Sequence, residues 1–309
     1  MANAIATTNQ RSLSNEKPKF SAFMSQEAIK KLVQQAVGQN AQSFTTAIIS
    51  AVSNNPALQE CNPTTILSAA LQGEALKLSP SPQLGQYYFL PFNKKDKQGN
   101  IIAVNAQFIL GAKGYKQLAM RSGQYADIDV IEIKQGEYKG RDKATGKQLF
   151  EFIEDDDQRE NLPTIGYMAY FELLNGFKKT VYWTKTKMIK HADTYSQAFS
   201  AEKYDDYING KIPQKELYKY SSFWYKNFDE MAFKTLIRHL ISQWGVMSID
   251  MQKAFEMDNS VINENGEAIN VEFEEDNAVS PNETIEPVVT NVTPEESEEF
   301  DFFADENKE

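Results

Sequence analysis

Residues 85–123 contain the clearest sequence signals for local structure in this chain. Within it, residues 87–92 and 101–109 are rich in aromatic and β-branched side chains, and the polar insert between them contains the Asn and Gly of a hairpin turn. Gly111 and Gly114 follow the second of these runs, and the apolar spacing after them predicts one face of a helix that ends at the last residue of the stretch. The stretch therefore predicts two antiparallel strands followed by a helix.

The charge of this stretch is one-sided, because its basic side chains stand against a single acid, Asp96. Aromatic rings lie among them, and a surface that follows a nucleic-acid backbone and stacks bases combines these two kinds of side chain. Lysine is also the usual residue of an exposed hairpin turn and of a solvated helix face, so a purely structural role stays open. The basic residues are Lys94, Lys95, Lys97, Lys113, Lys116 and Arg121.

The length and composition are those of a globular chain with a sizeable core. At 309 residues, 41% of them hydrophobic, the chain is long enough for one large domain or two small ones. We find no run of about 18 or more apolar residues and no charged-then-apolar start, so we expect no membrane span, no secretion and a cytoplasmic protein. Cys61 is the single cysteine and there are two histidines, which predicts neither an internal disulfide nor a structural metal site.

The net charge of −11 is unevenly distributed along the chain. Residues 258–309 contain 17 acidic residues and one basic residue, a net charge of −16, which leaves 26 acids and 31 bases, a net of +5, in residues 1–257. The chain is therefore a mildly basic body with an acidic tail. Its overall negative charge is no argument against a polyanionic partner for the body.

The order of the expected elements predicts an α+β fold with N-terminal helices, an antiparallel, hairpin-rich sheet and a long helix toward the C-terminal side. We expect a disordered arm over residues 1–24, one folded domain over residues 25–257 and a disordered acidic tail over residues 258–309. The expected helices cover residues 25–38, 42–54, 62–78, 221–245 and 247–257, and the further strands residues 128–134, 149–153, 164–174 and 177–183.

A second basic and aromatic region lies on the hairpin that turns at residues 175–176. Residues 175–192 contain five lysines and no acid, and a tyrosine and a tryptophan lie among them. The recurrence of this mixture on a separate hairpin favours a nucleic-acid surface over a chance patch. Lys178 and Lys179 become candidate contacts on charge alone.

The expected long helix of residues 221–245 carries both a charged stripe and an apolar face. Lys226, Lys234, Arg238 and a glutamate between them follow at four-residue steps and share one side of the helix. The stripe is either a solvated, salt-bridged face or part of one groove with the two lysine-rich hairpins. Trp224, at the start of the helix, is either a core residue or part of the same groove.

The sequence shows no set of residues that we would expect to catalyse a reaction. Residues 140–148, GRDKATGKQ, fail as a phosphate-binding loop because five residues separate the glycines, Gln148 stands where Ser or Thr is needed, and a strand follows. The acidic run EDDD at residues 154–157 could collect a divalent ion, but such a run is more often a solvated loop. No nucleophile, base and orienting group form a set. We therefore expect no enzyme and no cofactor, and leave an influence of Mg²⁺ on DNA binding open.

The end of the tail differs from the rest of it, because Phe300, Phe302 and Phe303 lie among acids. This pattern suits docking on a basic, apolar pocket. Our hypothesis is that the tail competes with nucleic acid for the basic body or recruits a partner. Unchanged oligonucleotide affinity at low salt after removal of residues 258–309 would contradict the first version.

Three stretches, in this order, carry a family resemblance: LKLSPSPQLGQYYFLPF at residues 76–92, FILGAKGYKQLAMRSGQ at residues 108–124 and FWYKNFDEMAFKTLIRHLISQWG at residues 223–245. They resemble the RecT family of phage and prophage single-strand annealing proteins, relatives of the phage lambda annealase Redβ. The resemblance covers roughly residues 25–257. It implies a sheet with a crossing helix, flanked by N-terminal helices, and subunits that assemble into rings or helical filaments around an exposed groove.

The resemblance also implies ATP-independent annealing of complementary DNA strands, which makes residues 25–257 a DNA-binding, annealing and oligomerisation domain. We expect the DNA-facing side chains to converge on one furrow. The positions carried over from the family are Lys94, Lys113, Tyr115, Trp224, Lys226, Lys234 and Arg238. Lys95, Lys116, Arg121, Lys178 and Lys179 are added on charge.

The resemblance implies four partners: single-stranded DNA, the annealed duplex, further copies of the chain and a companion exonuclease. Whether the host single-strand binding protein is a further partner stays open. A plain single-strand binding protein would have the same patches but would protect strands instead of pairing them. A metal-dependent nuclease using residues 155–157 would degrade DNA in magnesium. An acidic scaffold or adaptor would show no salt-dependent DNA binding.

Overall fold

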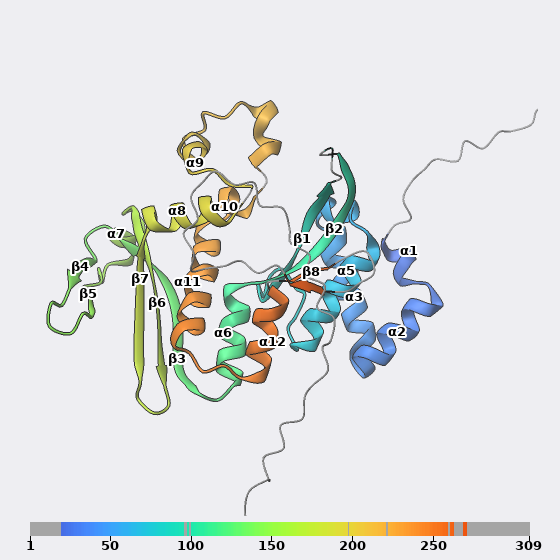
Figure 1. The fold of residues 1–309 in the computed structure, drawn as a ribbon, viewed down its shortest axis with the longest axis horizontal. Helices are drawn as coiled ribbons and strands as arrows, with labels where there is room; N and C mark the ends of the chain where they lie inside the picture. The colour runs from blue at the N-terminus through green and yellow to red at the C-terminus, as the bar shows by residue number, and fades with distance from the viewer. Residues whose placement is uncertain are drawn as a thin grey trace, which may run out of the picture. The chain divides into compact units, whose positions relative to one another are not determined.

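The computed structural model describes residues 20–95, 98, 100–196, 198–220, 222–258, 260–262 and 268–270. Residues 1–19 of the arm expected over residues 1–24, most of the acidic tail and its phenylalanine-rich end lie outside these residues. Residues 20–24 were expected to belong to the disordered arm, but they form a helix, α1 (Phe20–Met24), in which Phe20 and Met24 are buried. Within the described residues, helices and antiparallel strands are mixed along the chain (Figure 1), which confirms the α+β class. None of the helices described combines the length and the apolarity that a bilayer crossing requires.

The chain begins with a group of short helices whose starts follow local sequence signals. The Asn62 side chain accepts a hydrogen bond from the Thr64 N–H, and Pro63 takes the first position of the helix that follows. Pro56 begins a short helix that Asn55 caps, between two of the expected helices. These elements are α1 (Phe20–Met24), α2 (Glu27–Val37), η1 (Gly38–Asn40), α3 (Ala41–Ser53), α4 (Pro56–Gln59) and α5 (Pro63–Ala75).

The central stretch folds as predicted into two strands and a helix: β1 (Tyr87–Lys95), β2 (Ile101–Leu110) and α6 (Ala112–Arg121). β1 and β2 pair antiparallel, from Tyr87 opposite Leu110 to Lys95 opposite Ile101. Tyr87, Phe89 and Phe108 are buried, and the ring centroids of Tyr87 and Phe108 lie 5.0 Å apart. These three rings therefore belong to the core and not to an exposed base-stacking surface.

A separate three-stranded antiparallel sheet follows, with the order β3-β6-β7. Its strands are β3 (Tyr125–Lys134), β6 (Thr164–Leu173) and β7 (Lys178–Thr184), and the chain between β3 and β6 forms β4 (Tyr138–Arg141), β5 (Gln148–Phe150) and α7 (Asp156–Glu160). The acidic run lies at the start of α7, where the Asp155 carboxylate accepts the Gln158 N–H at 3.0 Å. Among the residues described, no group of His, Cys, Asp and Glu is arranged to hold a metal ion.

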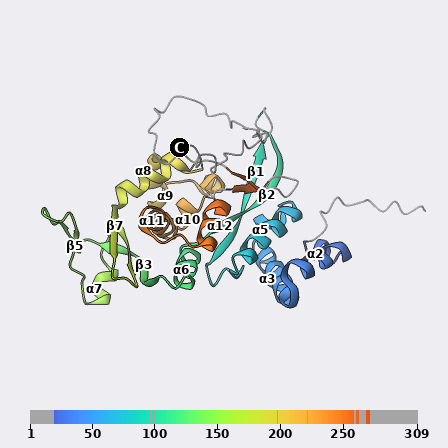
Figure 2. The ribbon, with the colours of Figure 1, turned by 60° about the horizontal axis from the view of Figure 1, so that its bottom comes forward.

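The remaining elements include a helix that crosses the sheet. They are α8 (Lys185–Tyr195), α9 (Ala201–Ile208), η2 (Gln214–Tyr220), α10 (Phe223–Lys226), α11 (Phe228–Trp244), α12 (Ile249–Asp258), β8 (Ser260–Ile262) and β9 (Ala268–Asn270). The expected long helix is interrupted at Asn227, whose φ of −138° and ψ of 58° separate α10 from α11. α11 contacts all three strands of the sheet on one side and α6 on the other (Figures 1 and 2). Regular structure also continues past residue 258, into the stretch expected to be a disordered tail.

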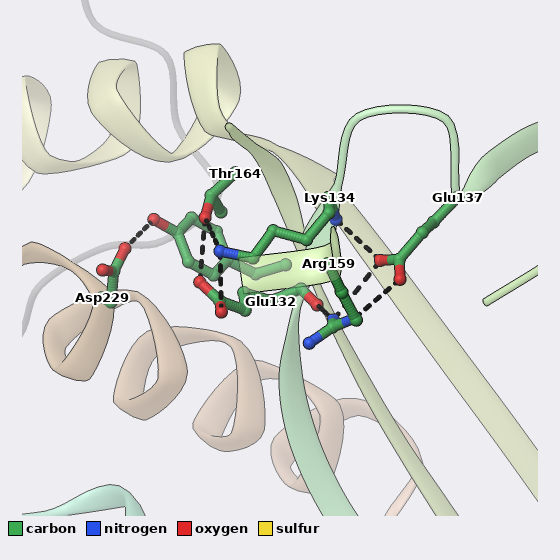
Figure 3. A network of polar contacts seen from close by, with 7 residues as sticks. Glu132, Lys134, Glu137, Arg159, Thr164 and Asp229 are labelled. Carbon is green, nitrogen blue, oxygen red and sulfur yellow. Dashed lines mark hydrogen bonds and ion pairs between the residues drawn. The ribbon is translucent and has the colours of Figure 1, made fainter. Parts of the chain in front are cut away.

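A buried ion pair fastens α7 to the turn that follows β3 (Figure 3). The Glu137 side chain is fully buried and accepts hydrogen bonds from Arg159 Nε at 2.7 Å and from the Lys134 N–H at 2.7 Å. Arg159 also donates to the Glu132 carbonyl oxygen at 2.7 Å. Burial by itself would raise the pKa of Glu137, but the hydrogen bonds from Arg159 and from the N–H groups of Lys134 and Ile153 hold this pKa below its usual value.

The same polar region ties the strands of the sheet to one another and to α11. The Lys134 ammonium group lies 2.9 Å from the Glu132 carboxylate, and both side chains bond the Thr164 hydroxyl. On the neighbouring strand, the Tyr167 hydroxyl donates to the Asp229 carboxylate at 2.5 Å, in the first turn of α11. These bonds fix where α11 begins relative to the sheet.

Candidate nucleic-acid interface

A pocket lies where the β1–β2 hairpin, the start of α6 and the α10–α11 segment meet. All three stretches that carried the family resemblance contribute to it, although up to about 145 residues of chain separate them. Its wall is mostly apolar, with one cation, one carboxylate and one carboxamide. The lining residues are Tyr88, Leu90, Ile109, Leu110, Gly111, Ala112, Phe223, Asn227, Glu230, Met231 and Lys234.

Two glycines allow the chain before β1 to lie directly against the start of α6. The Gly111 N–H donates to the Gln86 carbonyl oxygen at 2.9 Å. A Cβ atom at Gly111 would lie 2.3 Å from the Gly85 carbonyl oxygen, and one at Gly114 would lie 2.1 Å from the Gln86 carbonyl oxygen. Only glycine permits this approach. The two glycines therefore permit the close backbone approach beside the pocket, which Gly111 itself lines.

An aromatic pair closes one side of the pocket. The rings of Tyr88, from β1, and Phe223, from α10, lie 6.3 Å apart between centroids, a contact that sequence analysis did not predict. Burial, and after it the nearby Glu230 carboxylate, raises the pKa of Tyr88, so its phenol stays protonated at neutral pH. The pocket therefore presents flat apolar surface without adding negative charge from this ring.

Two of the predicted contacts are exposed lysines that are adjacent in the sequence to residues lining the pocket. Lys113 is exposed in the first turn of α6, next to the lining residue Ala112. Lys226 is exposed at the end of α10, next to the lining residue Asn227. Lys94 is exposed farther along β1, whereas the side chain of its neighbour Lys95 lies outside the described part of the chain. Contact of these lysines with DNA stays a prediction.

Three other predicted contacts converge on a carboxylate that the sequence did not single out. Asp258 accepts hydrogen bonds from the Tyr115 hydroxyl at 2.9 Å and from Lys234 Nζ at 2.9 Å. Arg238 Nε lies 3.9 Å from its second oxygen. Tyr115 is fully buried, and burial together with Asp258 raises its pKa well above the usual value. No sequence signal marked Asp258, because it is the first residue of the apparent acidic tail.

Lys116 and Arg121 of α6 have partners that join elements of the fold. Lys116 Nζ lies 2.6 Å from the Asp129 carboxylate on β3. Arg121 donates to the carbonyl oxygens of Leu76 and Lys77 at the end of α5 and lies 3.2 Å from Asp250. These contacts give both side chains a structural role, and a role in DNA binding stays a prediction.

The lysines of the second hairpin lie apart from the pocket. Lys178 pairs with Glu172 at 2.7 Å, and Lys179 Nζ lies 4.4 Å from the ring centroid of Trp244. Trp244 ends α11, ten residues and so about 15 Å along the helix from Lys234, which lines the pocket. This hairpin therefore carries its own cationic and aromatic surface.

The structure places Trp224 in the core rather than in a groove. Its side chain is 7% exposed and packs on Phe228, with ring centroids 5.3 Å apart, and on Phe199 at 6.2 Å. The expectation that all twelve candidates share one furrow is therefore not met. Lys234 lines the pocket, and Lys113 and Lys226 each follow or precede a lining residue in the sequence, whereas the other candidates with described side chains make internal contacts or lie elsewhere.

Comparison with known proteins agrees with the resemblance in the sequence. The sequence model of the RecT family matches residues 42–281. The uncharacterized protein YqaK of Bacillus subtilis (strain 168) is 35% identical over 233 residues, which are 75% of this chain and 69% of YqaK. Protein RecT of Escherichia coli (strain K12) is 31% identical over 204 residues, which are 66% of this chain and 65% of that protein. The chain thus spans about two thirds of the length of each relative.

Proposed function

Because the chain belongs to the RecT family, we propose that it anneals complementary DNA single strands without ATP. The observation that carries the proposal is the pocket, in which three stretches far apart in the sequence meet beside exposed lysines. A hairpin, a helix start and a crossing helix would not need to present an apolar, cation-flanked hollow if their only task were to form a core.

The mechanism is binding followed by pairing, with no bond made or broken by the protein. Lys113 and Lys226 neutralise phosphates of one strand, and each phosphate contact contributes about −0.7 to the slope of log affinity against log salt. The apolar wall with Tyr88 and Phe223 supports sugars and bases by contact, without reading sequence. A complementary strand is then selected by base pairing, which also supplies the free energy of annealing.

The family resemblance supports three finer parts of the proposal, which concern assembly, partners and location. Copies of the chain line up as a ring or helical filament, so that the pockets repeat along a strand and binding becomes cooperative. The partners are single-stranded DNA, the annealed duplex, a companion exonuclease and the host single-strand binding protein, in the cytoplasm of a bacterial host. Neither a cofactor nor catalysis enters this mechanism.

The test is an annealing assay with two complementary oligonucleotides that carry a fluorescence donor and acceptor, in buffer without nucleotide. The wild-type chain should accelerate pairing, and the variant Lys113→Ala with Lys226→Ala should lose most of this acceleration and about 1.4 of the salt slope. The matched control removes Lys143 and Lys147, two exposed lysines in the β4–β5 turn, and should anneal like wild type.

Three outcomes would count against the proposal. Strand binding without faster pairing would instead identify a protein that covers and protects single strands. Shortened oligonucleotides in magnesium would identify a nuclease. Equal loss of pairing in the Lys143 and Lys147 control would mean that general positive charge, and not the pocket, carries the effect.

A further inference from the structure

Asp258, the last residue of α12, carries a carboxylate that is 3% exposed and is surrounded by donors from three other elements. The Leu110 N–H at the end of β2 donates to it at 2.8 Å. The Tyr115 hydroxyl of α6 and Lys234 of α11 donate at 2.9 Å each, and Arg238 lies 3.9 Å away. Two cations therefore share one anion, and all the donors come from elements other than α12.

This set of donors is suited to a phosphate group as well as to a carboxylate. A phosphodiester also carries one negative charge and two free oxygens, and lysine, arginine, hydroxyl and backbone N–H groups all bind phosphate oxygens in proteins. The site also borders the pocket, because Leu110 and Lys234 line both. A strand that follows the pocket would therefore bring a phosphate next to Lys234.

We propose that Asp258 occupies a phosphate subsite of the DNA interface and leaves it when a strand binds. This inference rests on the proposed function. The exchange of one anion for another keeps every buried donor satisfied, and this avoids the cost of leaving Lys234 and Arg238 buried without an anion. The displaced carboxylate returns to water. Only the last turn of α12 has to open, and terminal helical turns fray readily.

The exchange couples strand binding to the segment that follows α12. The Phe255 ring, one turn before Asp258, packs on Tyr115 with centroids 5.3 Å apart and lies 5.2 Å from the Arg238 guanidinium carbon. When the last turn opens, this packing loosens as well. β8 begins two residues after Asp258 and contacts β2 and α5. A bound strand therefore weakens the attachment of the C-terminal segment, and a detached segment favours strand binding to the same extent.

The variant Asp258→Asn keeps the shape of the side chain and removes the competing charge. Its affinity for a fluorescein-labelled oligothymidylate should exceed that of wild type by about 5- to 150-fold, the usual range for coupled sites. The salt slope should stay within about 0.7 of the wild-type slope, because both bound states make the same phosphate contacts. Glu256→Gln is the control, since it removes one exposed charge from the same helix and should change the affinity far less.

Two results with Asp258→Asn would overturn the inference. Affinity equal to or below that of wild type would mean that Asp258 does not compete with DNA. A slope steeper by about 1.4 would mean that Lys234 and Arg238 gain phosphate contacts that wild type never makes, so that Asp258 stays in place there.

Amide hydrogen exchange on the wild-type chain tests the displacement of Asp258 even if the variant does not fold. Exchange at residues 254–258 should become faster when the oligonucleotide is added, and unchanged or slower exchange would refute the displacement. If wild type anneals strands and these tests fail, the subsite alone is refuted. If wild type neither binds nor anneals strands, the proposed function fails and the subsite fails with it.

Discussion

Replacing Arg159 with methionine would test how strongly one cation supports the fold around the β4–β5 insertion. The Glu137 carboxylate is fully buried, and Arg159 is the cation that bonds it, at 2.7 Å through Nε and at 3.3 Å through a terminal nitrogen. Methionine keeps much of the volume of the arginine stem but leaves the carboxylate without its counter-ion. The variant should therefore unfold more easily, although it removes no apolar contact.

The magnitude follows from the geometry of this pair. Removal of one partner from a buried ion pair costs about 3–5 kcal/mol, because the other charge stays buried. Glu137 keeps the N–H bonds from Lys134 at 2.7 Å and from Ile153 at 3.4 Å. Arg159 is itself 23% exposed, so water reaches the edge of the site. We therefore expect a loss of about 3 kcal/mol in the free energy of unfolding at pH 7, at the lower end of that range.

The loss should depend on pH in a defined direction. In wild type the pKa of Glu137 is held below its usual value, so its contribution to stability is present above the unfolded pKa of about 4.3 and is lost as the pH falls through the lower, folded pKa. Without Arg159, burial dominates and raises the pKa of Glu137. In the variant, protonation of Glu137 at moderately acidic pH then removes the buried, unpaired charge. The difference in the free energy of unfolding between variant and wild type should therefore shrink as the pH falls from 7 toward 4.

The measurement is urea denaturation followed by circular dichroism at several pH values. Arg141→Met is the matched control, because Arg141 is an exposed arginine on β4, and its loss should cost less than about 0.5 kcal/mol. Adding Glu137→Gln to the Arg159 variant should restore part of the stability. A cost below about 1 kcal/mol that does not change with pH would show that water screens Glu137 and that the buried-pair reasoning is wrong.

Three further predictions concern the pocket and its surroundings. Gly114→Ala should lower the free energy of unfolding, measured by thermal denaturation, by about 1–3 kcal/mol, because its Cβ atom would lie 2.1 Å from a backbone oxygen. The control Gly123→Ala meets no atom within 4 Å and should lower it by only about 1 kcal/mol, for its positive φ; equal losses would contradict the close approach at Gly114. Trp224→Phe should lower the unfolding temperature but leave the oligonucleotide affinity of the folded protein unchanged, and a selective loss of affinity would return this ring to the DNA interface. Lys234→Ala and Arg238→Ala should each weaken strand capture and flatten its salt dependence, and wild-type binding by both variants would mean that these side chains serve the fold and not DNA binding.

The local elements could be predicted from the sequence because each depends on residues a few positions apart. The hairpin at residues 175–176 forms where the Asn175 side chain accepts the Phe177 N–H and Gly176 takes a φ of 85°. The cap at Asn62 is equally local. The break between α10 and α11 was missed because the apolar period runs through Asn227 without interruption. The structure shows that period divided between two helices of different direction.

Composition and periodicity are properties of the chain alone, and they were enough to predict a basic, aromatic-rich body with strand hairpins and a charged helix. Which of those charges a ligand can reach depends on how the elements pack together. In the sequence, a lysine looks identical whether its side chain is exposed to water, as that of Lys113 is, or bonded to a buried carboxylate, as that of Lys234 is to Asp258. That difference arises when β2, α6, α11 and α12 come together, because the partner of a charge is set by distance in space and not by position along the chain.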